Sequence, residues 1–450
     1  MEHQKFNYRH LDELKETITR IGVELPVSER LDFLKKSVLL SGKLLNNRMV
    51  IHPMEGCDGA IDGTPDELTF RRYKRFGAGG AGLLWVEACA VANEGRANIR
   101  HLCLNRDNVP AFKQLFDDMM TGAKESSVDD FRPYTVLQLT HAGRYSKPYP
   151  DPTAIVAVTM NPYLDPVSNP KRRLITDDEL ERLEDQYVEV ALMAKEIGFD
   201  AIDIKSCHRY LISELLSAHT REGRYGGRFD NRVRFLLNII DKLKTKVDID
   251  IAVRLNAYDA IPYPYGWGTD ENGNPALDEP QRLMQLLQEK GVRLVNITTG
   301  NPYYNPHIGR PADAGPYVAP EHPVESAARM LNIVKEMKTA APDMTVVGTG
   351  FSWFREFGAN IAVGCIEKGW MDMAGFGRQS FAYPDFARDI ITRGAMAHNK
   401  CCIACTKCTE LMRFGGKAGC VVRDSTIYLP LWREATNGRT MMSTSIASHV

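Results

Sequence analysis

Four side chains that can move protons or stabilise negative charge fall within six residues of the sequence: Lys205, Cys207, His208 and Tyr210. They lie at the end of residues 201–205 and just beyond, where apolar and polar residues alternate with a period of two and predict a β-strand. A buried strand with a few satisfied polar residues is the simpler interpretation. The density of reactive groups favours a catalytic site instead.

Three of these groups have a definite chemical use. A phenol has a pKa near 10, so Tyr210 stays protonated at pH 7 and can give a proton to a carbanion-like carbon. His208 and Lys205 can hold a carbonyl oxygen while it gains negative charge, and such a donor is worth about 3 kcal/mol in a transition state. Lys205 could instead be a nucleophile that forms a Schiff base, which would make the protein a lyase.

A second group of reactive residues lies near the C-terminus. Five of the ten cysteines fall between residues 401 and 420, and four follow a C-x-x-C-x-x-C pattern with the last after eleven further residues: Cys402, Cys405, Cys408 and Cys420. This spacing predicts a 4Fe–4S cluster. A zinc site is the alternative, although zinc sites more usually show two separated C-x-x-C pairs. Cys401 adjoins Cys402, so the first ligand stays open.

The elements that must position these residues follow a repeated pattern. Eight short apolar segments have the composition of buried strands, and helical patterns such as Asp177–Ile197 and Asn231–Leu243 separate most of them. The segments begin within residues 46–56 and continue at 83–87, 134–139, 201–205, 250–255, 293–298, 345–348 and 372–376. This alternation predicts an α/β fold, a (β/α)8 TIM barrel. A doubly wound sheet would carry an early G-x-G-x-x-G on its first strand, and none occurs in that context.

The chain divides into three parts around this barrel. Residues 1–45 predict an N-terminal helical cap, with apolar residues at helical spacing in Leu11–Ile21 and Leu31–Leu40. The barrel occupies residues 46–395, and residues 396–450 form a cysteine-rich iron–sulfur segment with a tail. Long inserts follow several strands, where barrel loops contact substrate: 146–175, 266–275 and 301–323.

Glycines at the ends of the seventh and eighth strands predict a phosphate site. The seventh strand ends in Gly348-Thr349-Gly350, and the eighth is followed by Gly377-Arg378. In TIM barrels these two loops commonly bind phosphate through backbone amides, which glycine lets a ligand approach closely. The guanidinium of Arg378 adds a fixed fork of donors. Tight turns that need glycine are the alternative explanation.

The residues around Tyr210 form part of a longer motif, H-x-Y-L followed by R-x-x-x-Y-G-G-x-x-x-N-R-x-R-F. Its members are His208, Tyr210, Leu211, Arg221, Tyr225, Gly226, Gly227, Asn231, Arg232, Arg234 and Phe235. This motif resembles that of the Old Yellow Enzyme family of FMN-dependent ene-reductases. The resemblance implies that hydride passes from NAD(P)H through FMN to the β-carbon of an α,β-unsaturated carbonyl substrate, with Tyr210 as the proton donor to the α-carbon.

The resemblance also implies which residues contact FMN. Pro53, Met54 and Glu55 match the loop along the ring, Ala88 matches a second-strand contact, Gln138 the pyrimidine edge and Arg254 the N1–C2 edge, while Gly377 and Arg378 match the family at the phosphate site. Two positions depart from the family. Lys205 stands where many relatives have histidine, and Arg209 stands where they usually have glycine. The substrate therefore stays open between a bulky enone, such as a steroid, and an enoate.

The cysteine segment resembles the one that follows the barrel in the 2,4-dienoyl-CoA reductase branch of the family, where the middle gap is three residues. Those relatives continue into a dinucleotide-binding region. Only 30 residues follow Cys420, so we expect an FMN–cluster module that matches the family over about residues 40–425. A separate reductase could feed the cluster. The protein could also be an electron-transfer subunit that passes electrons between cluster and FMN.

The charge balance, the apolar runs and the cysteine count exclude several classes of function. Basic and acidic residues number 56 and 57, so nothing indicates a nucleic-acid-binding surface. The sequence contains no run of about 18 apolar residues, so it predicts no membrane span. The N-terminus lacks the apolar core of a signal peptide. Ten cysteines without such a signal predict a reducing, cytoplasmic location. A homo-oligomer is compatible with the sequence, and NADH and NADPH are not distinguished.

Overall fold

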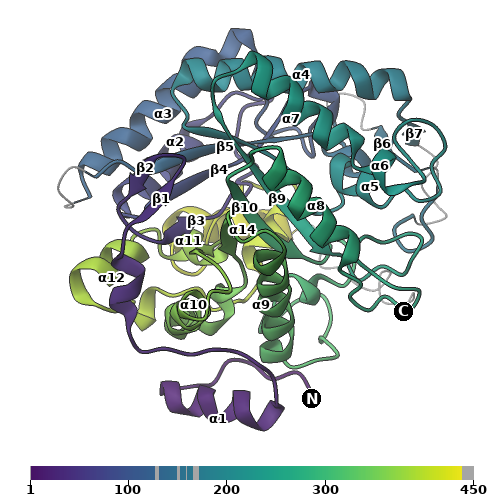
Figure 1. Ribbon diagram of the computed structural model, residues 1–450. Helices are drawn as coiled ribbons and strands as arrows, with labels where there is room; N and C mark the ends of the chain where they lie inside the picture. The colour runs from purple at the N-terminus through teal and green to yellow at the C-terminus, as the bar shows by residue number, and fades with distance from the viewer. Residues whose placement is uncertain (1, 127–130, 149–152, 159, 166–171, 438–450) are drawn as a thin grey trace.

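Eight parallel strands form a closed barrel at the centre of the molecule (Figure 1). The structure is a computed structural model that describes residues 2–126, 131–148, 153–158, 160–165 and 172–437. The barrel strands are β3 (Met49–Ile51), β4 (Leu83–Ala90), β5 (Tyr134–Thr140), β8 (Ala201–Ile204), β9 (Asp250–Tyr258), β10 (Leu294–Thr299), β11 (Thr345–Gly348) and β12 (Met373–Phe376). Each pairs with the next along the chain, and β12 closes on β3. The (β/α)8 barrel predicted from the sequence is confirmed.

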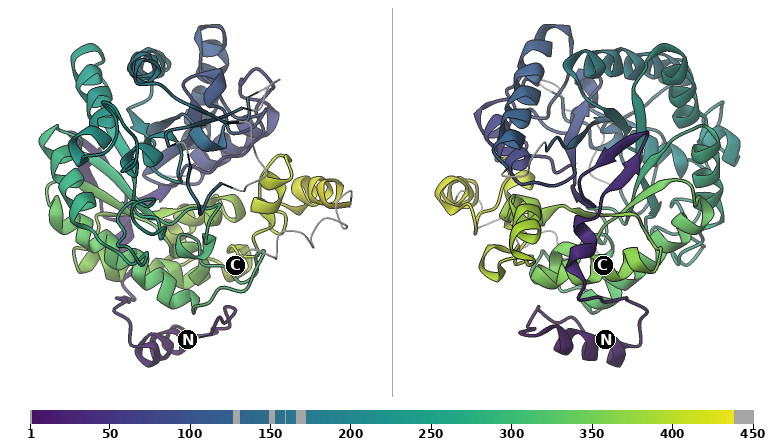
Figure 2. Two further views of the ribbon diagram at one scale, coloured as in Figure 1. Left: turned by 90° about the vertical axis from the view of Figure 1, so that its right-hand side faces the viewer. Right: turned by 60° about the vertical axis from the view of Figure 1, so that its left-hand side comes forward.

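Helices surround the barrel on its outer side (Figures 1 and 2). They are α2 (Glu67–Ala78), α3 (Val109–Lys124), α4 (Asp177–Ile197), α5 (Leu211–Leu216), α6 (Phe229–Arg232), α7 (Arg234–Lys246), α8 (Asp278–Glu289), α9 (Pro323–Ala340), α10 (Gly358–Glu367), α11 (Arg378–Ala382) and α12 (Phe386–Arg393). The helix predicted at Asn231–Leu243 is two consecutive helices, α6 and α7, on either side of Val233.

The bounds of α4 agree with the prediction, and local chemistry explains them. The Thr176 side chain accepts a hydrogen bond from the backbone of Glu179, whose carboxylate accepts one from the backbone of Thr176. At the other end Gly198 has φ 117°, which glycine adopts without strain. These two signals define where the helix starts and stops.

Two apolar layers form the core, one inside the barrel and one between strands and helices. Ala201 packs inside the barrel, whereas Ile202 and Ile204 belong to the outer layer. The alternation predicted for the strand is therefore confirmed, with both faces buried. Asp203 lies on the inner side, where its carboxylate accepts a hydrogen bond from Trp85 Nε1 at 2.9 Å. Alternate positions of β8 thus direct polar groups into the barrel.

The N-terminal region is helical only in part. Helix α1 (Leu11–Ile21) is where it was predicted. The prediction of a second helix at Leu31–Leu40 is wrong. A short 3₁₀ turn (Leu31–Lys35) leads instead into a hairpin of β1 (Val38–Leu40) and β2 (Lys43–Leu45). Ser41 and Gly42 have φ of 49° and 78°, the turn geometry that suits a two-residue hairpin. Alternate leucines of the hairpin join the apolar layer inside the barrel.

Two inserts and the C-terminal segment complete the fold. The 146–175 insert lies partly outside the described residues, and its described parts include the parallel pair β6 (Ala154–Val156) and β7 (Arg172–Leu174). After the barrel come α13 (Lys407–Arg413) and α14 (Ser425–Asn437), and α14 projects from the side of the barrel (Figure 2). Among the described residues, every helix is too short or too polar for a membrane span. All ten cysteines are free thiols.

Candidate active site

A cavity of about 190 Å³ lies where the barrel strands end. One water needs only ~10–15 Å³, so the cavity can hold a larger ligand. Most residues predicted to contact cofactor or substrate line it: Pro53, Met54, Glu55, Lys205, His208, Tyr210, Arg254, Thr349, Gly350, Gly377 and Arg378. The insert 301–323 also contributes to its wall, as expected of a substrate-side loop, whereas 266–275 does not.

Three predicted cofactor contacts lie behind this wall. Gln138 donates through Nε2 to Asp203 Oδ2 at 2.6 Å, and the carbonyl oxygen of Ala88 lies 2.9 Å from His101 Nε2. Gly348 packs so closely against Met371 that a Cβ would overlap its sulfur. None of the three lines the cavity, and their contacts with a cofactor stay predictions.

Glu55, Lys205 and Tyr210 form one connected group. Lys205 Nζ lies 2.7 Å from Glu55 Oε1, and the Tyr210 hydroxyl donates to the two carboxylate oxygens at 3.2 and 3.3 Å. The ammonium also lies 3.8 Å from the centroid of the Tyr210 ring. Burial, reinforced by the negative charge of Glu55, raises the pKa of Tyr210 well above its ordinary value. The phenol is therefore protonated at neutral pH, as a proton donor must be.

The charges of Glu55 and His208 follow from their surroundings. Burial opposes ionisation of Glu55, but Lys205, His101 and the hydrogen bond from Tyr210 together outweigh it and lower the pKa of this carboxyl to about 2. Burial also lowers the pKa of His208 well below its usual range, and the nearby Arg254 and Lys205 add to the effect. His208 is thus a neutral imidazole at pH 7, which can donate a hydrogen bond to an oxygen without adding a charge.

The turn that carries His208 has an uncommon backbone. His208 and Arg209 have φ of 62° and 58°, in the left-handed region where side chains are costly. This explains why a glycine would suit position 209. The Arg209 side chain is fully buried, pairs with Asp259 at 3.1 Å and hydrogen-bonds to Ser217. These contacts fix the turn, and with it the direction of His208 and Tyr210.

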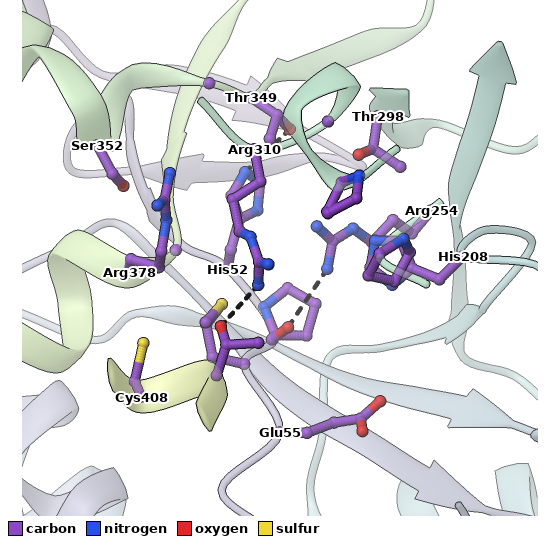
Figure 3. A pocket seen from close by; sticks show the side chains of 18 of the residues that line it. His52, Glu55, His208, Arg254, Thr298, Arg310, Thr349, Ser352, Arg378 and Cys408 are labelled. Carbon is purple, nitrogen blue, oxygen red and sulfur yellow. Dashed lines mark hydrogen bonds between the residues drawn. The ribbon is translucent and has the colours of Figure 1, made fainter. Parts of the chain in front are cut away.

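Two guanidinium groups share the other end of the cavity (Figure 3). Arg378 donates through Nη2 to the carbonyl of Pro311 at 2.7 Å, while its buried Nη1 has no hydrogen-bond partner among the described residues. Arg310 donates to Thr409 Oγ1 at 2.6 Å. Burial and the nearby charge of Arg378 lower the pKa of Arg310 to about 10. Unpaired positive charge of this kind suits a phosphate.

Sequence reasoning missed His52 and Arg310, both of which line the cavity. His52 lies beneath Gly375, where a Cβ would overlap its ring, and its Nε2 is 3.1 Å from Thr349 Oγ1. The signal for His52 is its spacing: it follows Val50 by two residues and so faces the same side of the strand. Arg310 lies on an irregular loop, and no periodicity in the sequence points to it.

The four cysteines predicted to bind iron lie near one another but are not arranged as metal ligands. Cys402, Cys405, Cys408 and Cys420 line one small cavity of about 20 Å³. In the part of the chain that the structure describes, however, no three His, Cys, Asp or Glu side chains are arranged to hold one metal ion. Cys401 does not line the cavity, and its Sγ donates to the carbonyl of Ala397 at 3.4 Å. The cluster therefore stays a prediction.

Comparisons with known proteins agree on one family. A sequence profile described as the NADH:flavin oxidoreductase / NADH oxidase family matches residues 38–393. An NADPH dehydrogenase from Listeria monocytogenes serotype 4a is 33% identical over 263 residues, which cover 57% of this chain and 70% of that protein. Another NADPH dehydrogenase, from Geobacillus sp., is 32% identical over 267 residues, covering 58% and 71%.

Solved structures share the fold. A complex of 2-naphthoyl-CoA reductase with 2-naphthoyl-CoA superposes with a TM-score of 0.72 at 18% identity, over 89% of this chain and 58% of that one. The old yellow enzyme homologue from Zymomonas mobilis gives 0.62 at 19% identity, over 81% and 94%. This chain thus spans little more than half of the reductase and nearly all of the smaller homologue.

Proposed function

This chain belongs to the NADH:flavin oxidoreductase / NADH oxidase family and is an oxidoreductase, and we propose that it is an FMN-dependent ene-reductase. Its substrate would be an α,β-unsaturated carbonyl compound and its electron donor NAD(P)H. The observation that carries the proposal is the composition of one cavity. A protonated phenol, two donors for a carbonyl oxygen and two guanidiniums for a phosphate all line it.

The cavity has the charges that FMN requires. Among the described residues that line it, four are cationic and one is a carboxylate: Lys205, Arg254, Arg310 and Arg378 against Glu55. A phosphate carries roughly −1.5 to −2 charges at pH 7, so it suits the unpaired guanidiniums. Gly350 has φ 120°, a conformation that glycine adopts without strain, and it lines the cavity beside Thr349. When bound, FMN supplies hydride transfer from NAD(P)H to the β-carbon of the alkene.

The residues of the chain supply the proton and the oxygen contacts. His208 and Lys205 would donate to the carbonyl oxygen of the substrate and stabilise the negative charge that develops there. Tyr210 would give its proton to the α-carbon, so that one hydride and one proton together saturate the double bond. The tyrosinate left behind would then recover a proton from water. Its neighbour Lys205, above the ring, would stabilise that anion in the interval.

The Schiff-base alternative has weaker support. A lysine nucleophile must be neutral to attack a carbonyl carbon. Lys205 Nζ lies 2.7 Å from Glu55 Oε1 in a buried ion pair, and this contact engages the nitrogen that would attack a carbonyl carbon. Borohydride trapping of a carbonyl compound on Lys205, in protein without flavin, would support the lyase.

An iron–sulfur cluster held by Cys402, Cys405, Cys408 and Cys420 is part of the proposal. Its support is that the four thiols face one cavity and that Cys401 faces elsewhere. The two cavities share Arg378, Phe381 and Cys408 in their walls. This adjacency favours a second candidate function, an electron-transfer subunit in which a separate reductase exchanges electrons with the cluster.

Cofactor analysis and turnover together test the proposal. Protein purified without oxygen should release one FMN per chain, and NAD(P)H should bleach its absorbance. A panel of unsaturated ketones, aldehydes and acids should then include compounds that restore the absorbance. FAD in place of FMN, or no flavin, would contradict the proposal. Bleaching by a reductase partner without reoxidation by any alkene would favour the electron-transfer subunit.

A further inference from the structure

The ammonium of Lys205 is already paired before any substrate arrives. Its Nζ lies 2.7 Å from Glu55 Oε1, and the two side chains are only 2% and 14% exposed. Among the described residues that line the cavity, Glu55 is the only carboxylate.

A second contact completes the surroundings of the ammonium. Its nitrogen lies 3.8 Å from the centroid of the Tyr210 ring, the distance of a cation–π contact. The Glu55 carboxylate therefore balances the charge of Lys205, and the aromatic face adds a favourable contact. The ammonium has three N–H donors, and Glu55 uses one of them. Lys205 can still donate a hydrogen bond to a substrate oxygen, but Glu55 offsets the attraction it would exert on a full carboxylate.

The position of Glu55 also matters for whatever binds beside Tyr210. The Tyr210 hydroxyl lies 3.2 and 3.3 Å from the two oxygens of Glu55. A substrate oxygen that accepts a hydrogen bond from Lys205 must also lie within a few ångströms of the Glu55 carboxylate, because Lys205 Nζ is 2.7 Å from Glu55 Oε1. An uncharged carbonyl brings no negative charge to this carboxylate when it binds. A substrate carboxylate in the same position places two negative charges together inside a buried cavity, where water screens them poorly.

We propose that Glu55 is a specificity-determining residue, which directs this site to uncharged unsaturated carbonyl compounds and away from unsaturated carboxylates. The inference rests on the proposed function and narrows its substrate class to ketones, aldehydes, esters or amides. Glu55 acts through charge: it neutralises Lys205 and repels a second anion. Removing that charge should free Lys205 to bind a carboxylate.

A matched pair of non-reducible ligands tests this without depending on their reactivity. 3-Phenylpropionamide and 3-phenylpropionate have the same shape and differ in charge, and binding of each to the FMN-loaded protein can be followed by calorimetry. The wild-type protein should bind the amide on the order of tenfold to 100-fold more tightly than the acid. Equal affinities, or tighter binding of the acid, would overturn the proposal even if no variant could be purified.

Variants then identify the responsible charge. Glu55→Gln keeps the shape of the side chain and should tighten binding of the acid at least tenfold relative to the amide. Glu55→Asp keeps the charge and should retain the wild-type preference. Lys205→Met leaves Glu55 without its partner and should weaken binding of the acid further. An unchanged ratio in Glu55→Gln would overturn the role of Glu55.

Turnover separates this inference from the function on which it rests. Wild-type protein should reduce methyl cinnamate in preference to cinnamate, and Glu55→Gln should shift the ratio of their kcat/KM values toward cinnamate, chiefly through a lower KM. Reduction of the ester with no shift in the variant would remove this inference and leave the ene-reductase intact. No reduction of any unsaturated carbonyl compound, despite bound FMN, would remove the proposed function itself.

Discussion

The guanidinium of Arg209 lies 3.1 Å from the carboxylate of Asp259, and neither side chain is exposed to solvent. The contact joins the turn after β8 to the end of β9, since Asp259 directly follows that strand. Arg209 has φ 58°, a conformation that glycine would adopt without strain. The ion pair therefore supports a turn that its own residue type disfavours, and that turn carries His208 and Tyr210.

Arg209→Gly should destabilise the protein although it relieves the backbone. The relief is worth about 1 kcal/mol, whereas breaking a buried pair and leaving Asp259 alone costs about 3–5 kcal/mol. The free energy of unfolding in urea should fall by about 3 kcal/mol. Adding Asp259→Asn should recover much of the loss, because no unpaired charge then remains. A single Arg209→Gly variant as stable as the wild type would mean that the ion pair contributes little.

The pH dependence of stability should report on Asp203. Burial raises the pKa of this carboxyl to about 6 from an ordinary value of 3.8, although its hydrogen bonds oppose the shift. The folded state then holds the proton more tightly, so Asp203 stabilises the fold at low pH and loses that contribution as pH rises through about 6. Relative to Asp203→Asn, the wild type should lose about 2 kcal/mol between pH 4 and pH 7.

Urea unfolding of both proteins at several pH values would measure this difference directly. The comparison with Asp203→Asn cancels the other groups that titrate in the same range. A difference in unfolding free energy that does not change with pH would show that Asp203 has an ordinary pKa in the folded protein.

The sequence predicted the barrel because its signal is repeated. Eight apolar segments each mark a strand, and one misjudged segment does not alter the pattern. The hairpin at Val38–Leu45 was missed because each of its strands has only three residues, too few to show a period of two. The apolar residues of Leu31–Leu40 also happen to be spaced as they would be in a helix. Its strand character depends on the turn at Ser41 and Gly42 and on packing beneath the barrel, which is tertiary information.

The parts of the site that lie close together in the sequence were predictable. Lys205, His208 and Tyr210 all follow strand β8, so the sequence alone shows that they are neighbours. The partnership of Lys205 with Glu55 crosses 150 residues of sequence, and only closure of the barrel brings the two together. Arg310 shows the other limit. It reaches the cavity from an irregular loop, where neither periodicity nor spacing constrains which side chain points inward.

The cysteine cluster predicts a distinct pattern of iron loss. Anaerobically purified protein should contain about four irons per chain, and Cys405→Ala or Cys408→Ala should each abolish the bound iron. Cys401→Ala is the matched control and should retain the iron. The Cys401 thiol donates to the carbonyl of Ala397 and does not line the small cavity formed by the other four cysteines. Iron and zinc analysis of the variants would measure this. Stoichiometric zinc in the wild type, or iron lost only in Cys401→Ala, would contradict the ligand set.

Tyr210→Phe should separate proton delivery from hydride transfer. The change removes the hydroxyl and keeps the ring that packs against Lys205. Bleaching of the flavin by NADPH needs no proton from Tyr210, so its rate should change little. Reoxidation by an enone should slow by about 10²–10⁴-fold, the usual worth of a positioned acid. Tyr303→Phe removes a hydroxyl that interacts with that of Tyr210, so stopped-flow measurements on it show whether the two phenols act together.

The same slowing of both half-reactions in Tyr210→Phe would point to damage of the flavin site. No slowing of the second half-reaction would mean that the proton comes from another group. A comparable loss in Tyr303→Phe would assign the proton to the tyrosines of the cavity jointly.

The origin of the hydrogen added to the alkene tests the ene-reductase most directly. Wild-type protein would turn over 2-cyclohexenone without oxygen, in ordinary water, with NADPH that carries deuterium at both positions of nicotinamide C4. The account predicts cyclohexanone with one deuterium at the β-carbon and a hydrogen from water at the α-carbon, as mass spectrometry and NMR would show. Product without deuterium, or a flavin that NADPH bleaches and no enone reoxidises, would contradict it.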